Sequence, residues 1–260
     1  MGNARGQAMN STADRMTAAY FDAIEFLCGV TPKGWYAEQG TARAAVTQAG
    51  VAALNVAYDT TREPDLGALD KMATEVGRQA ERWSIMVREA DDDVAALAAR
   101  HGLVNRSELP LLACAAADLV FRATTAQREP IRRVGAAESD LYTEVLTEGF
   151  EAPEGIFGPL MGGGVLDADP ITGYLAEEAG QPAGTGLGIV TSGLIGVFNI
   201  AVAPSARGRG LGRAITETVL SDGIAAGADA AYLQSSAMGR PLYESMGFRV
   251  VENWTVFLAG

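Results

Sequence analysis

The sequence predicts an α/β protein with two domains, each a mixed central sheet flanked by helices, of which the N-terminal domain is partial or degenerate. The 260 residues are 48% hydrophobic and 20% charged, which is ordinary for a globular protein. At ~150 residues per domain, this length allows one large or two small units, and two units agree better with it. Helix-type and strand-type patterns alternate along both halves. Short matches also recur at offsets of 144 and 145 residues, with 54–57 aligned on 198–201 and 100–103 on 245–248. Chance also produces such matches in an Ala-rich chain. The hypothesis that the two halves are copies of one domain therefore depends mainly on their shared order of strands and helices.

The first half begins with a helix and continues with alternating strands and helices. Apolar residues spaced by three and four predict an amphipathic helix over 13–28, followed by a loop with Pro32 and Gly34. Asp91 and Gly102 are typical of the start and end of another helix. Two β-type runs of hairpin character are predicted at 42–48 and 51–59, followed by a helix at 66–79. A strand is predicted at 82–89 and a final buried strand at 109–116.

The second half begins at a polar segment with a proline, residues 123–130, which predicts domains at 1–125 and 126–260. Its main helix follows a glycine-rich bend and ends before Gly227. The predicted strands lie at 131–137, 171–181, 186–192, 196–204, 230–236 and 248–260, and the predicted helices at 138–149, 153–164, 211–226 and 239–247.

The charge distribution argues against two classes of partner. The formal net charge is −12, and residues 129–260 carry 7 Lys/Arg against 16 Asp/Glu. An acidic surface repels nucleic acid and anionic lipid and attracts a cationic or amine ligand, although acidity for solubility alone explains the same numbers. The long uncharged run at 179–206 is divided by glycines, prolines and a turn at 191–193, so it predicts two strands and no membrane span.

Cysteine and histidine usage limits the chemistry. Cys28 and Cys114 form no CxxC pair and lie in apolar surroundings, which predicts buried free thiols in a reducing compartment. His101 is the only histidine, so a histidine triad in the second half and a metal site with two histidines are not expected. The N-terminal residues lack the apolar core of a signal peptide, and we expect a cytoplasmic protein.

The most informative segment is the bend between the strand ending at Pro204 and the helix starting near Leu211. A strand that turns through glycines into a helix exposes unpaired N–H groups at a positive dipole end, where anions bind. Three arginines add charge-assisted contacts to phosphate oxygens. The glycines at 208, 210 and 212 do not match the dinucleotide fingerprint, and the Lys of a phosphate-binding P-loop is absent.

The spacing Arg-x-x-Gly-x-Gly after an apolar strand resembles the diphosphate-binding motif of the GNAT superfamily of acetyl-CoA-dependent N-acetyltransferases. Residues 233–248, LQSSAMGRPLYESMGF, resemble a second signature of that family, a strand followed by a helix with Leu-Tyr and a closing Gly-Phe. The resemblance covers about residues 131–258, and the first half is similar to a degenerate copy of the same GNAT-like domain.

The resemblance implies roles for specific residues. Two strands at 196–203 and 230–235 are expected to splay apart, so that backbone groups of the first bond the pantetheine and an N–H near Val202 meets the thioester carbonyl. Tyr243 is the expected acid for the departing thiolate, and Ser236 stands where many relatives have Asn. The expected cofactor-binding residues are Ile200, Ala201, Val202, Arg207, Gly208, Arg209, Gly210, Leu211, Gly212, Arg213 and Ser236.

The general base is not evident. Relatives often carry a Glu on the fourth strand, where this chain has Gly196 and Val197. Glutamates at 151, 154, 177 and 178 are the substitutes, and Asn199 is a candidate for orienting substrate or water. Glu151 and Asn199 are the predicted substrate contacts.

The corresponding bend of the first half, residues 60–69, keeps only Gly67 and places Glu63, Pro64 and Asp65 where a phosphate would lie. Ala98 stands at the position of the tyrosine, so we expect a structural lobe without coenzyme.

The resemblance therefore implies transfer of an acetyl group from acetyl-CoA to a primary amine of a small molecule or peptide, without a metal. A non-catalytic acyl-CoA-binding or sensing protein is the alternative. A monomer or homodimer is expected.

Overall fold

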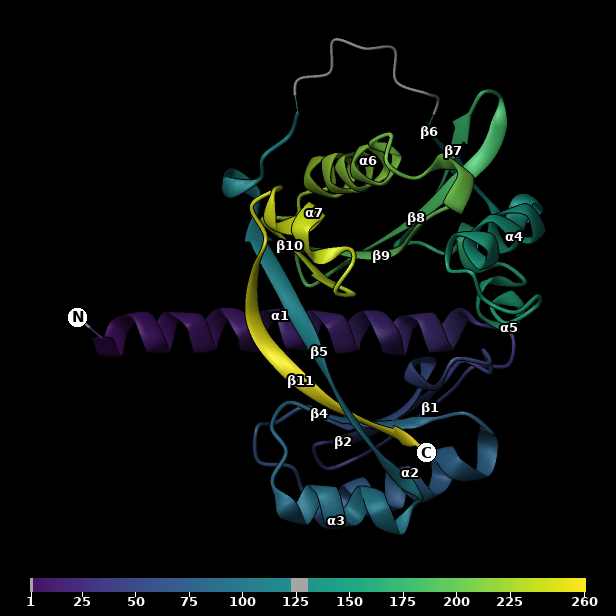
Figure 1. Cartoon of the computed structure of the whole chain (residues 1–260). Coiled ribbons are helices and arrows are strands. Elements are labelled where there is room, and N and C mark those ends of the chain that lie inside the picture. Colours follow the sequence, from purple (N-terminus) through teal and green to yellow (C-terminus); the bar gives the residue numbers. More distant parts are fainter. Residues whose placement is uncertain (1, 123–130) are drawn as a thin grey trace. The chain divides into compact units, whose positions relative to one another are not determined.

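The computed structural model describes residues 2–122 and 131–260 (Figure 1), so the predicted linker at 123–130 lies outside the described residues. The chain forms two compact units, which are Met1–Leu111 with Val250–Gly260, and Leu112–Arg249. Each unit has an α/β fold with a mixed sheet flanked by helices.

The C-terminal strand belongs to the first unit, which differs from the predicted division at 125. Strand pairing explains this grouping, because β11 (Arg249–Ala259) lies antiparallel to β4 (Ser84–Val87). Thr255 is opposite Val87 and Leu258 is opposite Ser84. A pairing between segments so far apart in sequence is not visible in a local hydrophobic pattern.

In the first unit, three antiparallel strands are followed by a strand parallel to the third. The sheet order is β1-β2-β3-β4-β11-β5, and Figure 1 shows α1 on one side of this sheet and α2 with α3 on the other. The elements are α1 Gly2–Val30, β1 Trp35–Gln39, β2 Ala42–Val46, β3 Asn55–Asp59, α2 Leu66–Gln79, β4, α3 Asp92–Arg100 and β5 Leu103–Ala115, with 3-10 turns at Ala52–Leu54 and Ala116–Asp118.

Local chemistry fixes the helices of this unit. Asp65 caps α2, because its Oδ1 accepts the N–H groups of Gly67 and Ala68 at 3.0 Å each. The α2 residues at helical spacing, among them Leu69 and Val76, are fully buried against the sheet. The predicted bounds of 66–79 are confirmed. The edge strand β1 was not predicted, and α1 is longer than the predicted 13–28.

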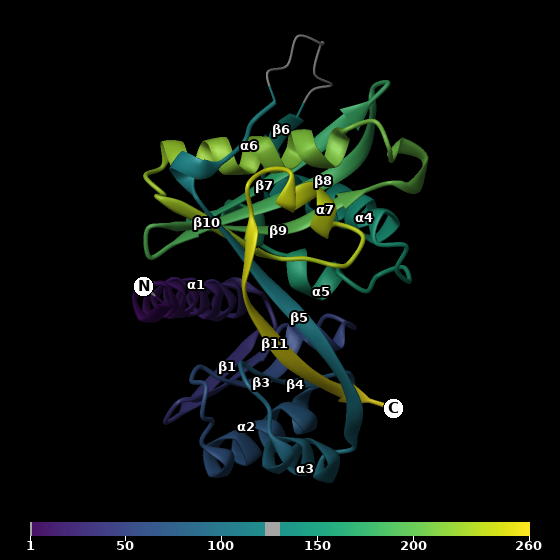
Figure 2. The same ribbon diagram turned by 60° about the vertical axis from the view of Figure 1, so that its left-hand side comes forward.

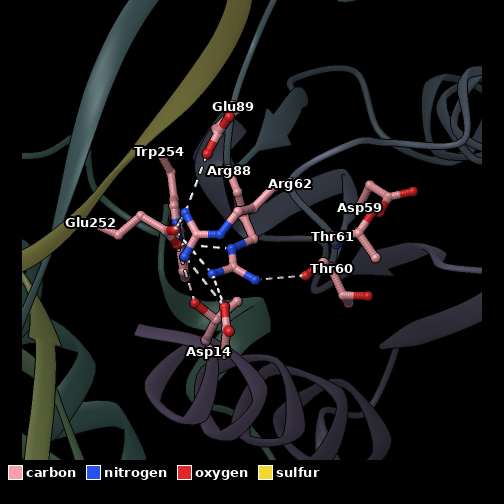
Figure 3. Close-up of polar contacts among 10 residues, drawn as sticks. Asp14, Asp59, Thr60, Thr61, Arg62, Arg88, Glu89, Glu252 and Trp254 are labelled. Carbon is pink, nitrogen blue, oxygen red and sulfur yellow. Dashed lines mark hydrogen bonds and ion pairs between the residues drawn. The ribbon is translucent and has the colours of Figure 1, made fainter. Parts of the chain in front are cut away.

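A buried ion-pair cluster joins α1, β4 and β11 within the first unit (Figure 3). Arg88 is 6% exposed and binds both carboxylate oxygens of Glu252 at 2.9 Å, and also Asp14 at 2.5 Å. Arg62 contacts Glu252 at 2.5 Å, and the indole N–H of Trp254 donates to Glu252 at 2.7 Å. Because the two guanidinium groups are neutralised by carboxylates, the cluster has little net charge of its own.

In the second unit, the strands β6 to β9 are antiparallel to their neighbours, and β9 and β10 are parallel. The sheet order is β5-β10-β9-β8-β7-β6, where only the end of β5 belongs to this unit. The elements are β6 Ile131–Val134, α4 Ser139–Gly149, α5 Gly158–Met161, β7 Ile171–Glu178, β8 Gln181–Thr191, β9 Leu194–Val202, α6 Leu211–Ala225, β10 Ala230–Gln234 and α7 Arg240–Glu244, with 3-10 turns at Ala136–Glu138, Val165–Asp167 and Pro204–Ala206.

Helices cover both faces of the β7–β9 layer (Figure 2). Helix α6 lies so close to β8 that a Cβ at Gly186 would be 2.5 Å from Ile215. On the other face, the buried Tyr142 of α4 donates its hydroxyl to the carbonyl of Gly186 at 3.2 Å. The hairpin between β8 and β9 turns at Ser192 and Gly193, both at positive φ, which confirms that the uncharged run forms two strands. In the described part of the chain, no helix has the length and hydropathy to cross a membrane.

Candidate functional site

The pairing of strands β9 and β10 ends partway along β9, where the family resemblance implied that the two strands splay apart. Their parallel pairing runs from Leu194 opposite Ala230 to Gly196 opposite Tyr232 and ends there. Strand β9 continues for six more residues to Val202. The backbone of residues 197–202 is therefore not paired with β10 in the described structure.

A bulge sets the direction of the backbone groups near the end of β9. The register with β8 shifts between Thr185 and Leu187, and Asn199 opposite this shift has φ of +52°. The N–H of Ala203 donates to the carbonyl of Ala183 on β8 at 2.8 Å. Because backbone groups alternate along a strand, those of Val202 point away from β8, toward the unpaired edge. The candidate residues Ile200, Ala201 and Val202 all lie on this segment.

The bend that follows leaves the start of α6 open. Gly208 has φ of +78° and Gly210 has φ of +86°, conformations that favour glycine, and a Cβ on either would meet no atom of the described residues within 4 Å. The first backbone bond of α6 runs from the N–H of Ala214 to the carbonyl of Gly210, at 3.0 Å. The N–H groups of Leu211, Gly212 and Arg213 thus precede the helical ladder, as an anion-binding helix start requires.

The three arginines of the bend have different surroundings. Arg213 is 7% exposed, and its Nη atoms donate to Glu217 and to backbone carbonyls of Val120 and Ser245 at 3.1 to 3.2 Å. Arg213 thus connects α6 to two other segments of the second unit. The sequence motif predicted a phosphate contact for Arg213 and did not predict this structural role. Arg209 is 61% exposed and pairs with Glu178.

Arg207 is bonded to protein acceptors. Its Nη1 contacts Glu151 at 2.8 Å, its Nη2 donates to the carbonyl of Gly149 at 2.8 Å, and its Nε donates to the carbonyl of Val202 at 3.1 Å. The bend thus places one exposed arginine, one buried arginine and one arginine turned to the end of α4.

Tyr243 and Ser236 lie on and before the short helix α7. Tyr243 is 8% exposed, and burial raises the pKa of its hydroxyl to about 12. Its ring packs edge-on against Phe248, with centroids 6.1 Å apart. Ser236 is exposed, and its hydroxyl accepts the N–H of Gly239 at 3.2 Å, which starts the α7 turn. The predicted roles of both residues toward coenzyme stay predictions.

The structure explains why β9 has no glutamate near its start. A Cβ at Gly196 would lie 2.6 Å from the Tyr232 hydroxyl and 2.5 Å from the Phe198 ring, so a side chain at this position requires both rings to move. Of the glutamates considered as substitutes, Glu151 pairs with Arg207, Glu178 with Arg209 and Glu177 with Arg132. Each of these three carboxylates therefore already forms an ion pair with an arginine of the protein.

Tyr142 is a polar residue beside the site that sequence reasoning missed. Burial raises the pKa of its hydroxyl, and hydrogen bonds with Asn199 and Thr185 oppose that rise. Thr185 donates to the Asn199 carbonyl at 2.8 Å, and the Asn199 amide contacts the sulfur of Met161 at 3.6 Å. Asn199 is thereby fixed at the bulge, and no sequence signal distinguished Tyr142 from an apolar helix residue.

The first unit lacks these features at the matching places. Strand β3 ends at Asp59, one residue after Tyr58, the last to pair with β4, so it has no unpaired extension like that of β9. The start of α2 is occupied by the carboxylate of Asp65. The first unit does have a groove of about 360 Å³ along α1, which is lined by acidic residues including Asp14 and Asp22 and by the buried Arg88.

The described residues include no metal-binding cluster, and their two thiols are buried. No group of three or more His, Cys, Asp or Glu side chains among them could hold a metal ion. Cys28 and Cys114 are free and buried, as predicted, and burial raises their pKa values to about 12 and about 11.

Comparisons with known proteins agree with this geometry. Residues 169–250 match the acetyltransferase (GNAT) domain family. Among solved structures, the chain is similar to a GCN5-related N-acetyltransferase from Kribbella flavida (18% identity, 95% of each chain covered, TM-score 0.65). It is also similar to one from Sphaerobacter thermophilus (19% identity, 84% of this chain and 76% of the other, TM-score 0.57).

A third similar structure is a putative GNAT-family acetyltransferase from Novosphingobium aromaticivorans (19% identity, 85% of this chain and 88% of the other, TM-score 0.53). No sequence among curated proteins matches. The domain match and the shared fold support an acyltransferase, and the matched residues contain the splayed strands and the glycine bend.

Proposed function

We propose that the second unit transfers an acetyl group from acetyl-CoA to a primary amine of a small molecule or peptide, by direct attack of the amine on the thioester. One observation carries this proposal. The unpaired edge of β9, residues 197–202, leads directly into a bend whose two glycines at positive φ open the start of α6. An edge for pantetheine and an anion site for the diphosphate thus follow one another along the chain.

In this proposal, backbone groups hold most of the coenzyme. Within Ile200 to Val202, the backbone groups that point to the unpaired edge bond the pantetheine amides, as a neighbouring strand would. The N–H groups of residues 208–213 bind the diphosphate, and the exposed Arg209 exchanges Glu178 for a phosphate oxygen. No metal takes part.

The chemical step then depends on two hydrogen donors, the backbone N–H of Val202 and the hydroxyl of Tyr243. The N–H of Val202 donates to the carbonyl oxygen as negative charge develops on it in the tetrahedral intermediate. When the intermediate collapses, the C–S bond breaks and Tyr243 gives its proton to the departing thiolate. A pKa of about 12 keeps this hydroxyl protonated at neutral pH, the state that an acid must have.

The acceptor must arrive as a neutral amine. For an alkyl ammonium of pKa near 10.4, loss of the proton at pH 7 costs roughly 4 to 5 kcal/mol. Because β9 has Gly196 and Val197 where many relatives carry a glutamate, this proton leaves through Glu151, Glu154 or ordered water, and Asn199 orients the acceptor. The acidic second half favours an amine that is cationic in solution.

We further propose that the first half, nominally residues 1–125, is a degenerate copy of the catalytic half at 126–260. The two units share the order of three antiparallel strands, a helix and a parallel strand. Asp65 at the start of α2 and the short β3 support a lobe that does not bind coenzyme. Buried free thiols agree with a reducing compartment, for which we propose the cytoplasm.

The second candidate function is a non-catalytic acyl-CoA sensor. The observation in its favour is the absence of a strand glutamate at Gly196. The two candidates share coenzyme binding and differ in turnover.

Calorimetric titration with coenzyme A, followed by thiol release from acetyl-CoA over a panel of amines, tests both candidates. We expect Gly210→Ala to weaken binding of coenzyme A by about tenfold or more, because a side chain at this φ distorts the anion site. Gly227→Ala is the matched control, since Gly227 follows the other end of α6 with φ of +99° and, among the residues that the structure describes, none lies within 4 Å of its Cβ position. Binding with no turnover of any amine favours the sensor, and no binding refutes both.

A further inference from the structure

The guanidinium group of Arg207 connects three places that are separate in sequence. It donates to the Val202 carbonyl on the unpaired part of β9 at 3.1 Å, to the Gly149 carbonyl at the end of α4 at 2.8 Å, and to Glu151 just beyond at 2.8 Å. Each of its three nitrogens therefore has a protein acceptor. Its side chain is 33% exposed, against 61% for Arg209 on the same bend.

The end of α4 also touches β9 directly. A Cβ at Gly149 would lie 2.7 Å from the Cβ of Ala201 and 3.0 Å from the backbone nitrogen of Val202. Only a glycine permits this approach. The start of the loop after α4 thus lies against the N–H group that the proposed function assigns to the thioester carbonyl.

The loop keeps an unfavourable backbone conformation at this point. Glu151 has φ of +53°, a region that residues other than glycine seldom adopt. Its N–H donates to the Glu148 carbonyl at 2.9 Å, and the next N–H, of Ala152, donates to Thr147 at 3.0 Å. Those bonds define how α4 ends, and the ion pair with Arg207 holds the Glu151 side chain in that arrangement.

The loop has the chemistry of a surface for an amine with an apolar part. It carries Glu151 and Glu154, and Phe150 is 51% exposed although its ring is 5.6 Å from that of Phe157. An acidic loop with an exposed aromatic ring attracts a cationic nitrogen and covers an attached hydrocarbon group.

We infer that Arg207 is a positioning residue that holds the loop at 150–157 against the reacting part of β9, and thereby sets the binding of the amine acceptor and not that of coenzyme A. The acceptor class is a primary amine, cationic in solution, attached to an apolar group. This inference rests on the proposed function, which supplies the role of β9. It assigns Arg207 a different role from the phosphate contact that the sequence motif implies.

Arg207→Gln and Glu151→Gln test this inference, with Arg209→Gln as the matched control on the same bend. In the first two variants we expect amide hydrogen exchange over 150–157 to become about tenfold faster, while the Kd for coenzyme A changes by less than about threefold. In Arg207→Gln, which keeps the candidate base Glu151, the KM for the amine found active in the thiol-release panel rises about tenfold, by more than any change in kcat. Arg209→Gln gives the reverse pattern, with weaker coenzyme binding and unchanged loop exchange.

In the double variant Arg207→Gln with Glu151→Gln, loop exchange is less than about twofold faster than in Arg207→Gln alone, because Arg207→Gln has already removed the ion pair with Glu151. The inference is wrong if Arg207→Gln weakens coenzyme A as much as Arg209→Gln and leaves loop exchange unchanged. A wild-type protein that binds no coenzyme A refutes the proposed function itself. Coenzyme binding together with unchanged loop exchange in Arg207→Gln refutes only the positioning role.

Discussion

Replacement of Glu252 by Gln is predicted to destabilise the first unit strongly. The side chains of Glu252 and Arg88 are each 6% exposed, and the carboxylate bonds Arg88 through both oxygens at 2.9 Å. Gln has nearly the same shape and keeps an oxygen for the indole of Trp254, which donates to Glu252 at 2.7 Å. The substitution therefore removes mainly charge, and it turns an amide NH2 group toward a guanidinium that has only N–H donors.

The expected loss follows from what remains around Arg88. Breaking a buried ion pair by removing one partner costs roughly 3 to 5 kcal/mol, because a charge is left uncompensated. Asp14 still contacts Arg88 at 2.5 Å, although its side chain is 54% exposed, so the remaining cation is partly neutralised. We therefore expect the lower end of that range, about 3 kcal/mol.

Urea denaturation followed by tryptophan fluorescence measures this loss, since Trp35, Trp83 and Trp254 all lie in the first unit. With a slope near 2 kcal/mol per molar urea, a loss of about 3 kcal/mol lowers the midpoint by about 1.5 M. Glu89→Gln is the control, because Glu89 is 63% exposed and makes one 3.2 Å contact with Arg62, a pair worth roughly 0 to 1 kcal/mol. Equal midpoints for the two variants would show that the buried pair contributes no more than a surface pair.

Two further predictions concern the site and the thiols. Tyr243→Phe should lower kcat by about 10²-fold with little change in the Kd of coenzyme A, as expected for loss of a general acid, and wild-type kcat in this variant would make solvent the proton donor. Cys28 and Cys114, with pKa values raised by burial to about 12 and about 11, should react with Ellman's reagent at pH 8 only after unfolding in urea. Rapid titration of two thiols in the folded protein would contradict their burial.

Elements with strong local signals were predictable from the sequence. Helix α2 has an N-terminal Asp cap and apolar residues at helical spacing, and its observed bounds are the predicted ones. Strand β1 was missed because it follows a loop with Pro32 and Gly34, lies at the edge of the described sheet beside β2 and has partly buried or exposed side chains. Its stability comes from the neighbouring strand, which a local pattern does not record.

The site was predictable where backbone conformation demands particular residues. Glycines at 208 and 210 indicated a bend with open N–H groups, and both have positive φ in the structure. The side-chain partners of Arg207 and Arg213 were not predictable, because a long flexible side chain can reach acceptors from elements distant in sequence. The carbonyl of Gly149, for example, is 58 residues away from Arg207.

The difference between the two halves follows from one competition at the start of a helix. The N–H groups of the first turn need acceptors, and a carboxylate one residue before the helix satisfies them without loss of chain freedom. In the first unit Asp65 does this for α2, so an external anion would have to displace a tethered one. In the second unit Gly210 holds the same place without a side chain, and α6 begins with its N–H groups open to an anion from solution. In the proposed function, the residue before the helix and the length of the unpaired strand decide which unit binds a diphosphate, and the order of strands and helix that the two units share does not.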